Sequence, residues 1–171
     1  MSTFWIINAL LFQIAWWISA LFPAQATMPL LGILLLHFVL STQRKSDLRL
    51  LLLAPIGWLV DGALIYFEVL QTSHHNVPIW LMLLWGVFIL TLNHSLQWLH
   101  RVKLLWLALL GALFGSISYV GAIKLGTLNT TMPLNIVAIL LGCIWFLLLP
   151  ILVGLTQIIS PNKTKMAATH A

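Results

Sequence analysis

The stretch Trp80–Arg101, WLMLLWGVFILTLNHSLQWLHR, decides the fold because a long apolar run is followed by a group of polar residues near one end. About 20 apolar residues are enough for a helix to cross the hydrocarbon core of a bilayer. Polar side chains are costly in lipid, so we expect this group to face protein, water or a ligand. Its members are Thr91, Asn93, His94, Ser95 and Gln97.

The composition of the 171 residues supports the same interpretation. Hydrophobic residues make up 61% of the chain and charged residues 6%, whereas about a quarter of a soluble domain is charged. The net charge is +5, but the basic residues lie in short connections between apolar runs. We therefore interpret them as a signal of membrane orientation, and we predict no nucleic-acid partner.

No metal site or cofactor is predicted. The single cysteine, Cys143, lies in an apolar run and has no ligand spacing around it. The adjacent pair His74–His75 has no flanking carboxylate or cysteine, and adjacent side chains point apart in regular structure.

The predicted fold is all-α: a polytopic membrane protein with one transmembrane domain over residues 1–171. Six transmembrane helices are expected, arranged as three αα-hairpins. The expected spans are residues 4–22, 27–41, 50–70, 79–99, 104–125 and 134–159, with a cytoplasmic tail at 160–171. The second span is the shortest, and whether it crosses the bilayer fully stays open.

The basic residues predict how the chain is threaded. Seven of them fall on one side if both termini are cytoplasmic, in the connections 42–49 and 100–103 and in the tail at Lys163 and Lys165. Only Lys124 falls outside, which satisfies the positive-inside rule. The first apolar run lacks a basic region before it, so we expect a retained span rather than a cleaved signal peptide.

Asp61 is the first candidate for a functional residue. It lies roughly 16 Å into the third span at 1.5 Å per residue, near the middle of the bilayer. A seven-residue step places it on one helical face with Ala54 and Glu68. Its side chain either binds a proton or substrate or forms a helix-packing hydrogen bond. The expected packing partners are Asn93, Gln13 and Ser118.

His94 is the second candidate. It is either a general base, ligand or headgroup contact, or a neutral histidine bonded to another helix. His37 and Asn8 lie at a similar depth on other spans. Asp61 and His94 are the catalytic candidates, although whether the protein is an enzyme stays open. The ligand-binding candidates are Asn8, Gln13, Asp61, Asn93, His94 and Ser118.

Small residues mark one face of the fifth span. Gly111 and Gly115 have the small-xxx-small spacing that lets two membrane helices approach closely. We interpret this face as a packing seam.

Several pieces of the chain together resemble a known family. They are NALLFQ at Asn8–Gln13 with Trp16–Trp17, Asp61, and TLNHSL at Thr91–Leu96, followed by Trp98–Leu99, Gly115 and Tyr119. This pattern resembles small bacterial inner-membrane proteins classed as a domain of unknown function, often encoded beside cyclopropane-fatty-acid synthase genes. The resemblance runs from Asn8 to about Gly126. It implies a bacterial cytoplasmic membrane and a link to lipid modification, and it brings no established activity.

Three functions are therefore considered. The first is an inner-membrane protein that binds or handles a lipid or small molecule, or assists a lipid-modifying enzyme. The second is a membrane-embedded lipid hydrolase or transferase, in which Asp61 and His94 must converge on one cavity. The third is a small proton-coupled transporter, which needs helices broken near the bilayer midplane. The expected partners are membrane lipid and a lipid-modifying enzyme, and the oligomeric state stays open.

Overall fold

The computed structural model describes residues 3–72 and 76–160, and these residues form helices joined by short connections. His74–His75 and the tail lysines lie outside the described residues. The elements are α1 (Phe4–Leu21), α2 (Thr27–Leu40), α3 (Arg44–Leu50), the 3₁₀ turn η1 (Leu51–Leu53), α4 (Ala54–Tyr66), α5 (Ile79–Asn93), the 3₁₀ segment η2 (Gln97–Arg101), α6 (Leu104–Lys124) and α7 (Leu134–Ile159). The all-helical prediction is confirmed.

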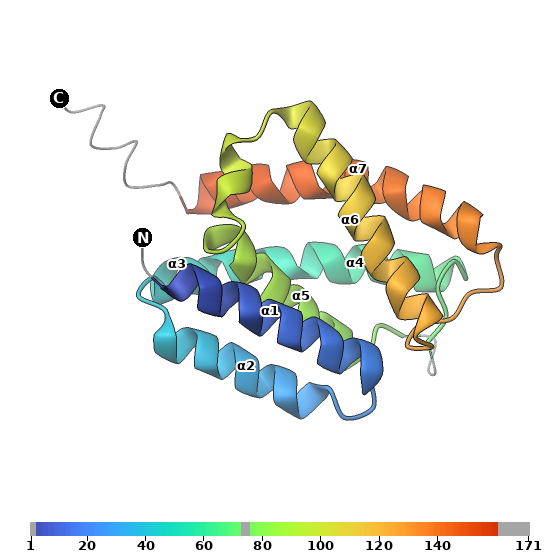
Figure 1. Cartoon of the computed structure of the whole chain (residues 1–171), viewed down its shortest axis with the longest axis horizontal. Helices are drawn as coiled ribbons and strands as arrows, with labels where there is room; N and C mark the ends of the chain where they lie inside the picture. The colour runs from blue at the N-terminus through green and yellow to red at the C-terminus, as the bar shows by residue number, and fades with distance from the viewer. Residues whose placement is uncertain (1–2, 73–75, 161–171) are drawn as a thin grey trace.

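The helical runs alternate in direction along the chain, with α3, η1 and α4 forming one run, and α6 crosses the others obliquely (Figure 1). Four helical runs are long and apolar enough to cross a membrane: Phe4–Leu21, Arg44–Tyr66, Leu104–Lys124 and Leu134–Ile159. The apolar helices α2 and α5 are shorter, with 14 and 15 residues. These helices indicate a membrane-embedded protein, although their lengths do not establish six spans.

Three boundaries differ by more than one residue from the expected ones, and one of them is the end of the third helical run, at Tyr66 rather than at residue 70. The third helical run begins at Arg44 rather than at residue 50, with η1 placed just before Pro55, where the proline ring would crowd a preceding carbonyl. The helix α5 ends at Asn93, although the span was expected to continue to residue 99. The backbone N–H of Ser95 donates to the side chain of Asn8 instead of to the preceding helical turn. This contact explains why the helix ends there.

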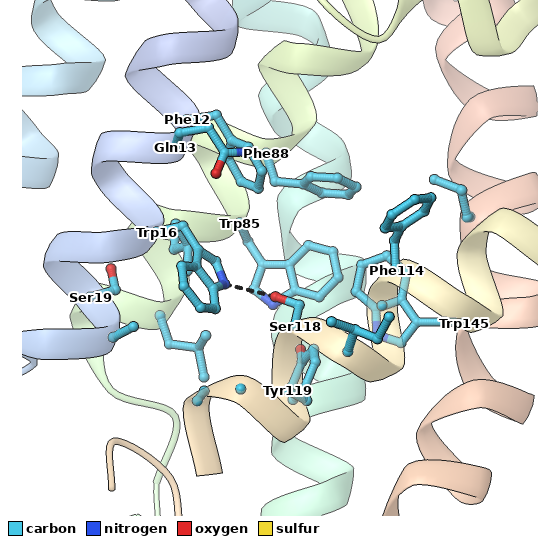
Figure 2. Close-up of a pocket in the computed structure, with 18 of the residues that line it drawn as sticks. Phe12, Gln13, Trp16, Ser19, Trp85, Phe88, Phe114, Ser118, Tyr119 and Trp145 are labelled. Carbon is cyan, nitrogen blue, oxygen red and sulfur yellow. Dashed lines mark hydrogen bonds between the residues drawn. The ribbon is translucent and has the colours of Figure 1, made fainter. Parts of the chain in front are cut away.

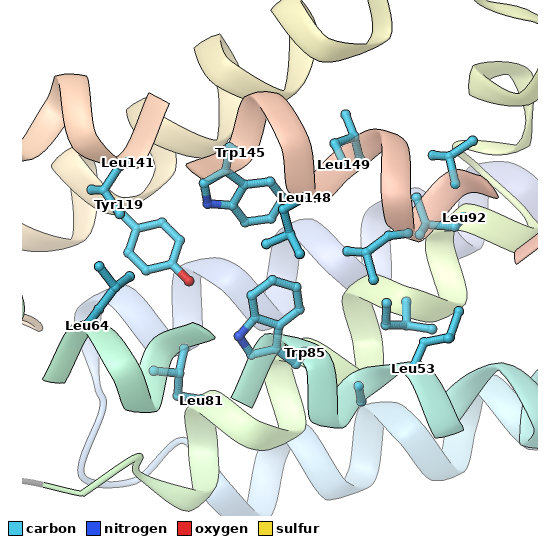
Figure 3. Close-up of a cluster of buried hydrophobic side chains, with 14 of the residues drawn as sticks. Leu53, Leu64, Leu81, Trp85, Leu92, Tyr119, Leu141, Trp145, Leu148 and Leu149 are labelled. Atoms are coloured by element: carbon cyan, nitrogen blue, oxygen red, sulfur yellow. The ribbon is translucent and has the colours of Figure 1, made fainter. Parts of the chain in front are cut away.

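The buried core has two parts. The larger joins α4, α5, α6 and α7 around Trp85, Tyr119 and Trp145 (Figure 3). The smaller joins α1, α2 and α5 around Leu11 and Leu30. Many large apolar side chains remain on the outside, as expected where lipid rather than water is the surrounding solvent.

The expected packing seam on α6 is confirmed, and its partner is α7. A Cβ added at Gly111 would lie 2.4 Å from the backbone oxygen of Trp145, and one at Gly115 would lie 2.1 Å from the indole Cγ. A Cβ at Gly57 on α4 would lie 2.0 Å from the indole of Trp85. The glycines therefore make room for two tryptophan rings in the core.

Candidate functional site

Asp47 on α3 is the centre of a buried polar cluster. Its side chain is fully buried, and each carboxylate oxygen accepts two hydrogen bonds. Oδ2 accepts from His37 Nε2 at 3.1 Å and from Ser41 Oγ at 2.5 Å. Oδ1 accepts from Asn93 Nδ2 at 2.8 Å and from His94 Nε2 at 2.9 Å. Because a carboxylate offers about four acceptor positions, its capacity is filled.

The neighbouring contacts define where the protons lie. The Oδ1 atom of Asn8 accepts from the backbone N–H of Ser95 at 3.1 Å and from its Oγ at 2.6 Å. The amide nitrogen of Asn8 therefore faces His37 Nδ1, at 3.3 Å. Since that ring nitrogen accepts, His37 carries its proton on Nε2 and donates to Asp47. We call the set Asn8, His37, Ser41, Asp47, Asn93, His94 and Ser95 the Asp47 cluster.

The same cluster contains three residues that could ligate a metal. Ligand atoms of His37, Asp47 and His94 lie within 4.8 Å of one another. A metal on Nε2 of His37 would displace the proton that Asp47 accepts. The ring of His37 would then carry its proton on Nδ1, and the Nδ1–H of a ligating histidine usually donates to an acceptor. Asn8 presents a donor there, so the contacts fit protons better than a metal ion.

Asp61 on α4 has a separate set of partners. Its carboxylate is fully buried and accepts from the Trp85 indole N–H at 2.6 Å and from the Tyr119 hydroxyl at 2.5 Å. Within residues 3–72 and 76–160, no basic side chain lies within ion-pair distance of it. We call Asp61, Trp85 and Tyr119 the Asp61 triad.

A groove of about 610 Å³ lies beside this triad, between α1, α5 and α6 (Figure 2). Aromatic side chains dominate its walls: Trp16, Trp85, Phe88, Phe114, Tyr119 and Trp145. Gln13 and Ser118 are among its few polar residues, and Trp16 Nε1 donates to Ser118 Oγ at 2.7 Å, which joins α1 to α6. We call this cavity the aromatic groove.

The aromatic groove is elongated. Its α6 wall extends from Leu110 to Ala122, which is about 18 Å at the helical rise per residue. Trp85 and Tyr119 line the groove and also donate to Asp61. The carboxylate of Asp61 therefore lies directly behind the groove wall.

The six predicted ligand-binding residues do not form one interior. Asn8, Asn93 and His94 belong to the Asp47 cluster, which agrees with their similar predicted depth. Gln13 and Ser118 line the aromatic groove, and Asp61 lies behind its wall. None of the expected packing partners bonds Asp61; Trp85 and Tyr119 do.

The catalytic candidates Asp61 and His94 are not brought together in hydrogen bonding, and they share no partner. The partner of His94 is Asp47, which sequence reasoning missed because it was counted with a basic connection. The sequence did contain a signal for Asp47. The seven-residue step that places Glu68, Asp61 and Ala54 on one helical face reaches Asp47 when it is extended two turns toward the N-terminus.

The chain belongs to the family described as "Protein of unknown function (DUF2878)", whose model matches residues 5–151. No curated protein and no solved structure matches it. The predicted membership of a family of unknown function is confirmed, while the bacterial origin and the gene neighbourhood stay expectations. The matched region includes the Asp47 cluster, the Asp61 triad and the aromatic groove. The family description names no activity, so function has to be argued from geometry.

Proposed function

We propose that this protein is a multi-pass membrane protein that binds the hydrocarbon portion of a membrane lipid in the aromatic groove. The observation that carries the proposal is the groove itself. Its volume of about 610 Å³ lies within the range of roughly 300–1,000 Å³ typical of ligand pockets. Its walls are largely apolar, and Trp17 and Phe114 on its rim are themselves exposed, so a chain in the bilayer can reach it.

The bundle also supports lateral access. The helices α1 and α6 are joined across the groove by the bond from Trp16 to Ser118 rather than by close packing along their lengths. In contrast, α6 packs closely on α7 through its glycines. A hydrocarbon chain lying between α1 and α6 would bury apolar surface on both helices.

We further propose a single transmembrane domain of six spans, threaded as three hairpins with both termini in the cytoplasm of a bacterial inner membrane. The Asp47 cluster joins α3 to the end of α5. We therefore expect the basic residues of α3 and those at and just after the end of η2 at the same end of the bundle, which favours a cytoplasmic location for that end. They are Arg44, Lys45, Arg49, Arg101 and Lys103.

Reporter fusions test this threading. A cytoplasmic reporter placed after residue 43 and one placed after residue 102 should both be active, and one placed after residue 126 should be inactive. Opposite locations for the first two positions would overturn the proposal of six spans.

Lipid binding is tested by filling the groove. A Cβ at Gly121 would lie 3.5 Å from the Trp16 indole, so Gly121→Leu projects a side chain into the groove without displacing backbone. Gly32→Leu on α2 is the matched control, because nothing lies within 4 Å of a Cβ there. Native mass spectrometry should find a lipid retained by the wild type and by Gly32→Leu and lost from Gly121→Leu. Equal retention by all three proteins would contradict the proposal.

The expected lipid-modifying enzyme remains part of the proposal as a partner to which the groove would present the chain. The geometry gives less support to the hydrolase and transporter alternatives. No observation favours the first, because Asp61 and His94 bond different residues. The second expected helices broken near the midplane, at Gly57–Trp58 or at Gly115–Ser116, and α4 and α6 are continuous through these positions. The 3₁₀ turn η1 before α4 changes the helical geometry over Leu51–Leu53 only.

A further inference from the structure

We propose that the aromatic groove prefers a lipophilic organic cation, such as a quaternary ammonium ion carrying an apolar group, over a neutral molecule of the same shape. This inference rests on the groove being a binding site, as proposed above. It adds the charge of the ligand, which the apolar lining alone does not specify.

The first step is the unbalanced charge of Asp61. Its side chain is fully buried, and both hydrogen-bond donors to it, Trp85 and Tyr119, are neutral groups. A buried carboxylate is unfavourable in a medium of low dielectric constant unless a proton or a cation compensates it. In the described part of the chain, the only ion pairs are those of Asp47 with His37 and His94.

The second step is the arrangement of the aromatic rings in front of this carboxylate. The indoles of Trp85 and Trp145 are stacked, with centroids 5.5 Å apart and planes 6° apart. Phe88 lies edge-on to both rings, with centroids 5.7 Å away from each. Tyr119 completes the wall, beside Trp145 and Trp85 (Figure 3), and its hydroxyl donates to Asp61.

Such a wall suits a cation for two reasons. Ring faces attract cations, and aromatic cages are the usual sites for quaternary ammonium groups. Trp85 and Trp145 are nearly buried, and the exposed rings beside them are Trp17 and Phe114. In addition, the N–H of Trp85 and the O–H of Tyr119 both donate to a carboxylate, which increases the electron density of these two rings. Asp61 thus acts on a ligand through the rings, without touching it.

The helices that line the groove carry little positive charge, and the basic residues nearest to it are His100 and Arg101 in η2, which follow the lining residues Trp98 and Leu99. The sequences of α1, α4, α5 and α7 contain no lysine, arginine or histidine. The single lysine of α6, Lys124, is its last residue, beyond the α6 wall that ends at Ala122. Arg101 is exposed at the η2 end, so beside Trp85 and Tyr119 the nearest charged group is Asp61.

The test uses two isosteric probes that differ in charge, (3-hydroxyphenyl)trimethylammonium and 3-tert-butylphenol. Each is titrated by calorimetry into the full-length protein in nanodiscs, and titration into empty nanodiscs corrects for partitioning into lipid. The wild type should bind the cation about tenfold more tightly than the neutral probe, within the range expected for cation–π attraction. Equal affinities, or a preference for the neutral probe, would overturn the inference.

Two variants test the assignment to this wall. Asp61→Asn keeps the size of the side chain and removes the charge, so the preference for the cation should fall to about twofold or less. Phe114→Leu removes an exposed ring, 63% exposed, from the rim and should weaken the cation more than the neutral probe. The second variant is informative even if the first does not fold. An unchanged preference in either folded variant would contradict the proposed site.

Two further comparisons separate the possible explanations. The affinity of the protein for the cationic probe is measured in nanodiscs of phosphatidylcholine and in nanodiscs of phosphatidylglycerol. A weaker apparent affinity in phosphatidylcholine identifies a lipid headgroup as the source of the ammonium. Equal affinities identify a free amphiphile. If Gly121→Leu loses its lipid but neither probe binds the wild type, the cation inference fails and the lipid-binding proposal stands. If lipid retention is also unchanged in Gly121→Leu, both fail.

Discussion

The indole rings of Trp85 on α5 and Trp145 on α7 stack at a centroid distance of 5.5 Å in the middle of the bundle. Each ring lies against a glycine of a neighbouring helix, Gly57 for the first and Gly115 for the second. The stack connects α5, which carries Trp85 of the Asp61 triad, to α7. Its integrity should therefore determine both stability and the shape of the aromatic groove.

Gly115→Ala should destabilise the protein, because the added methyl group would lie 2.1 Å from the indole of Trp145. The loss of free energy of unfolding should be about 1–3 kcal/mol, as for other overpacked cores. Thermal unfolding in detergent measures it. Gly32→Ala, at a position with open space, is the control and should be neutral or slightly stabilising. A Gly115→Ala protein as stable as this control would disprove the close approach.

Asp47→Asn should be more damaging than a comparable change at the surface. Each carboxylate oxygen of Asp47 accepts hydrogen bonds from two residues. In the variant an NH₂ group, which donates, replaces one of these oxygens, so at least one buried donor loses its acceptor. A cost of about 3–5 kcal/mol is expected for disrupting such a buried group. Glu68→Gln, which also neutralises an acid but at an exposed position, should change stability by no more than about 0.5 kcal/mol. Similar unfolding temperatures for the two variants would contradict the role of Asp47.

Removal of metal ions should leave the Asp47 cluster intact. Asn8 directs a donor at His37, so protons rather than a metal hold the cluster together. We expect the unfolding temperature of purified protein to be unchanged after dialysis against EDTA, and unchanged after zinc is added back. A drop with EDTA that zinc reverses, together with about one zinc per chain by elemental analysis, would show that the site binds metal.

The free energy of unfolding should decrease at acidic pH because of His100 in η2. Its Nε2 lies 3.0 Å from Thr156 Oγ1 on α7, and burial lowers its pKa from the ordinary value of 6.5. The unfolded chain then binds more protons than the folded one, so stability decreases as the pH falls below 6.5. The unfolding temperatures of wild type and His100→Gln, compared from pH 8 to pH 5, isolate this contribution. Parallel curves for the two proteins would disprove it.

The elements that could be predicted from the sequence are those fixed by local pattern. Apolar runs defined the helices, and the spacing of Gly111 and Gly115 identified the face of α6 that packs closely. The family membership also followed from the short motifs. The end of α5 did not follow, because it depends on Asn8, 87 residues from Ser95 along the chain.

The candidate site was predicted in part. Asn8, Asn93 and His94 were chosen because polar groups at one depth in a membrane tend to meet, and they do meet. Asp47, the partner that Asn93 and His94 share, was missed, since its burial depends on the helical run beginning at Arg44. The chain has nine tryptophans, and the sequence pattern does not indicate which of them bonds Asp61.

Contact between lipid chains and the inner wall of the aromatic groove tests the account most directly. Trp85 is 4% exposed and lines the groove, Leu59 on α4 is 74% exposed on the outer surface, and Ile89 is fully buried away from the groove. Intermolecular nuclear Overhauser effects from acyl methylene protons should be measured to all three side chains in nanodiscs. We predict signals at Trp85 and Leu59, none at Ile89, and loss of the Trp85 signal alone in Gly121→Leu. A signal at Leu59 with none at Trp85 in the wild-type protein would contradict lipid binding in the groove.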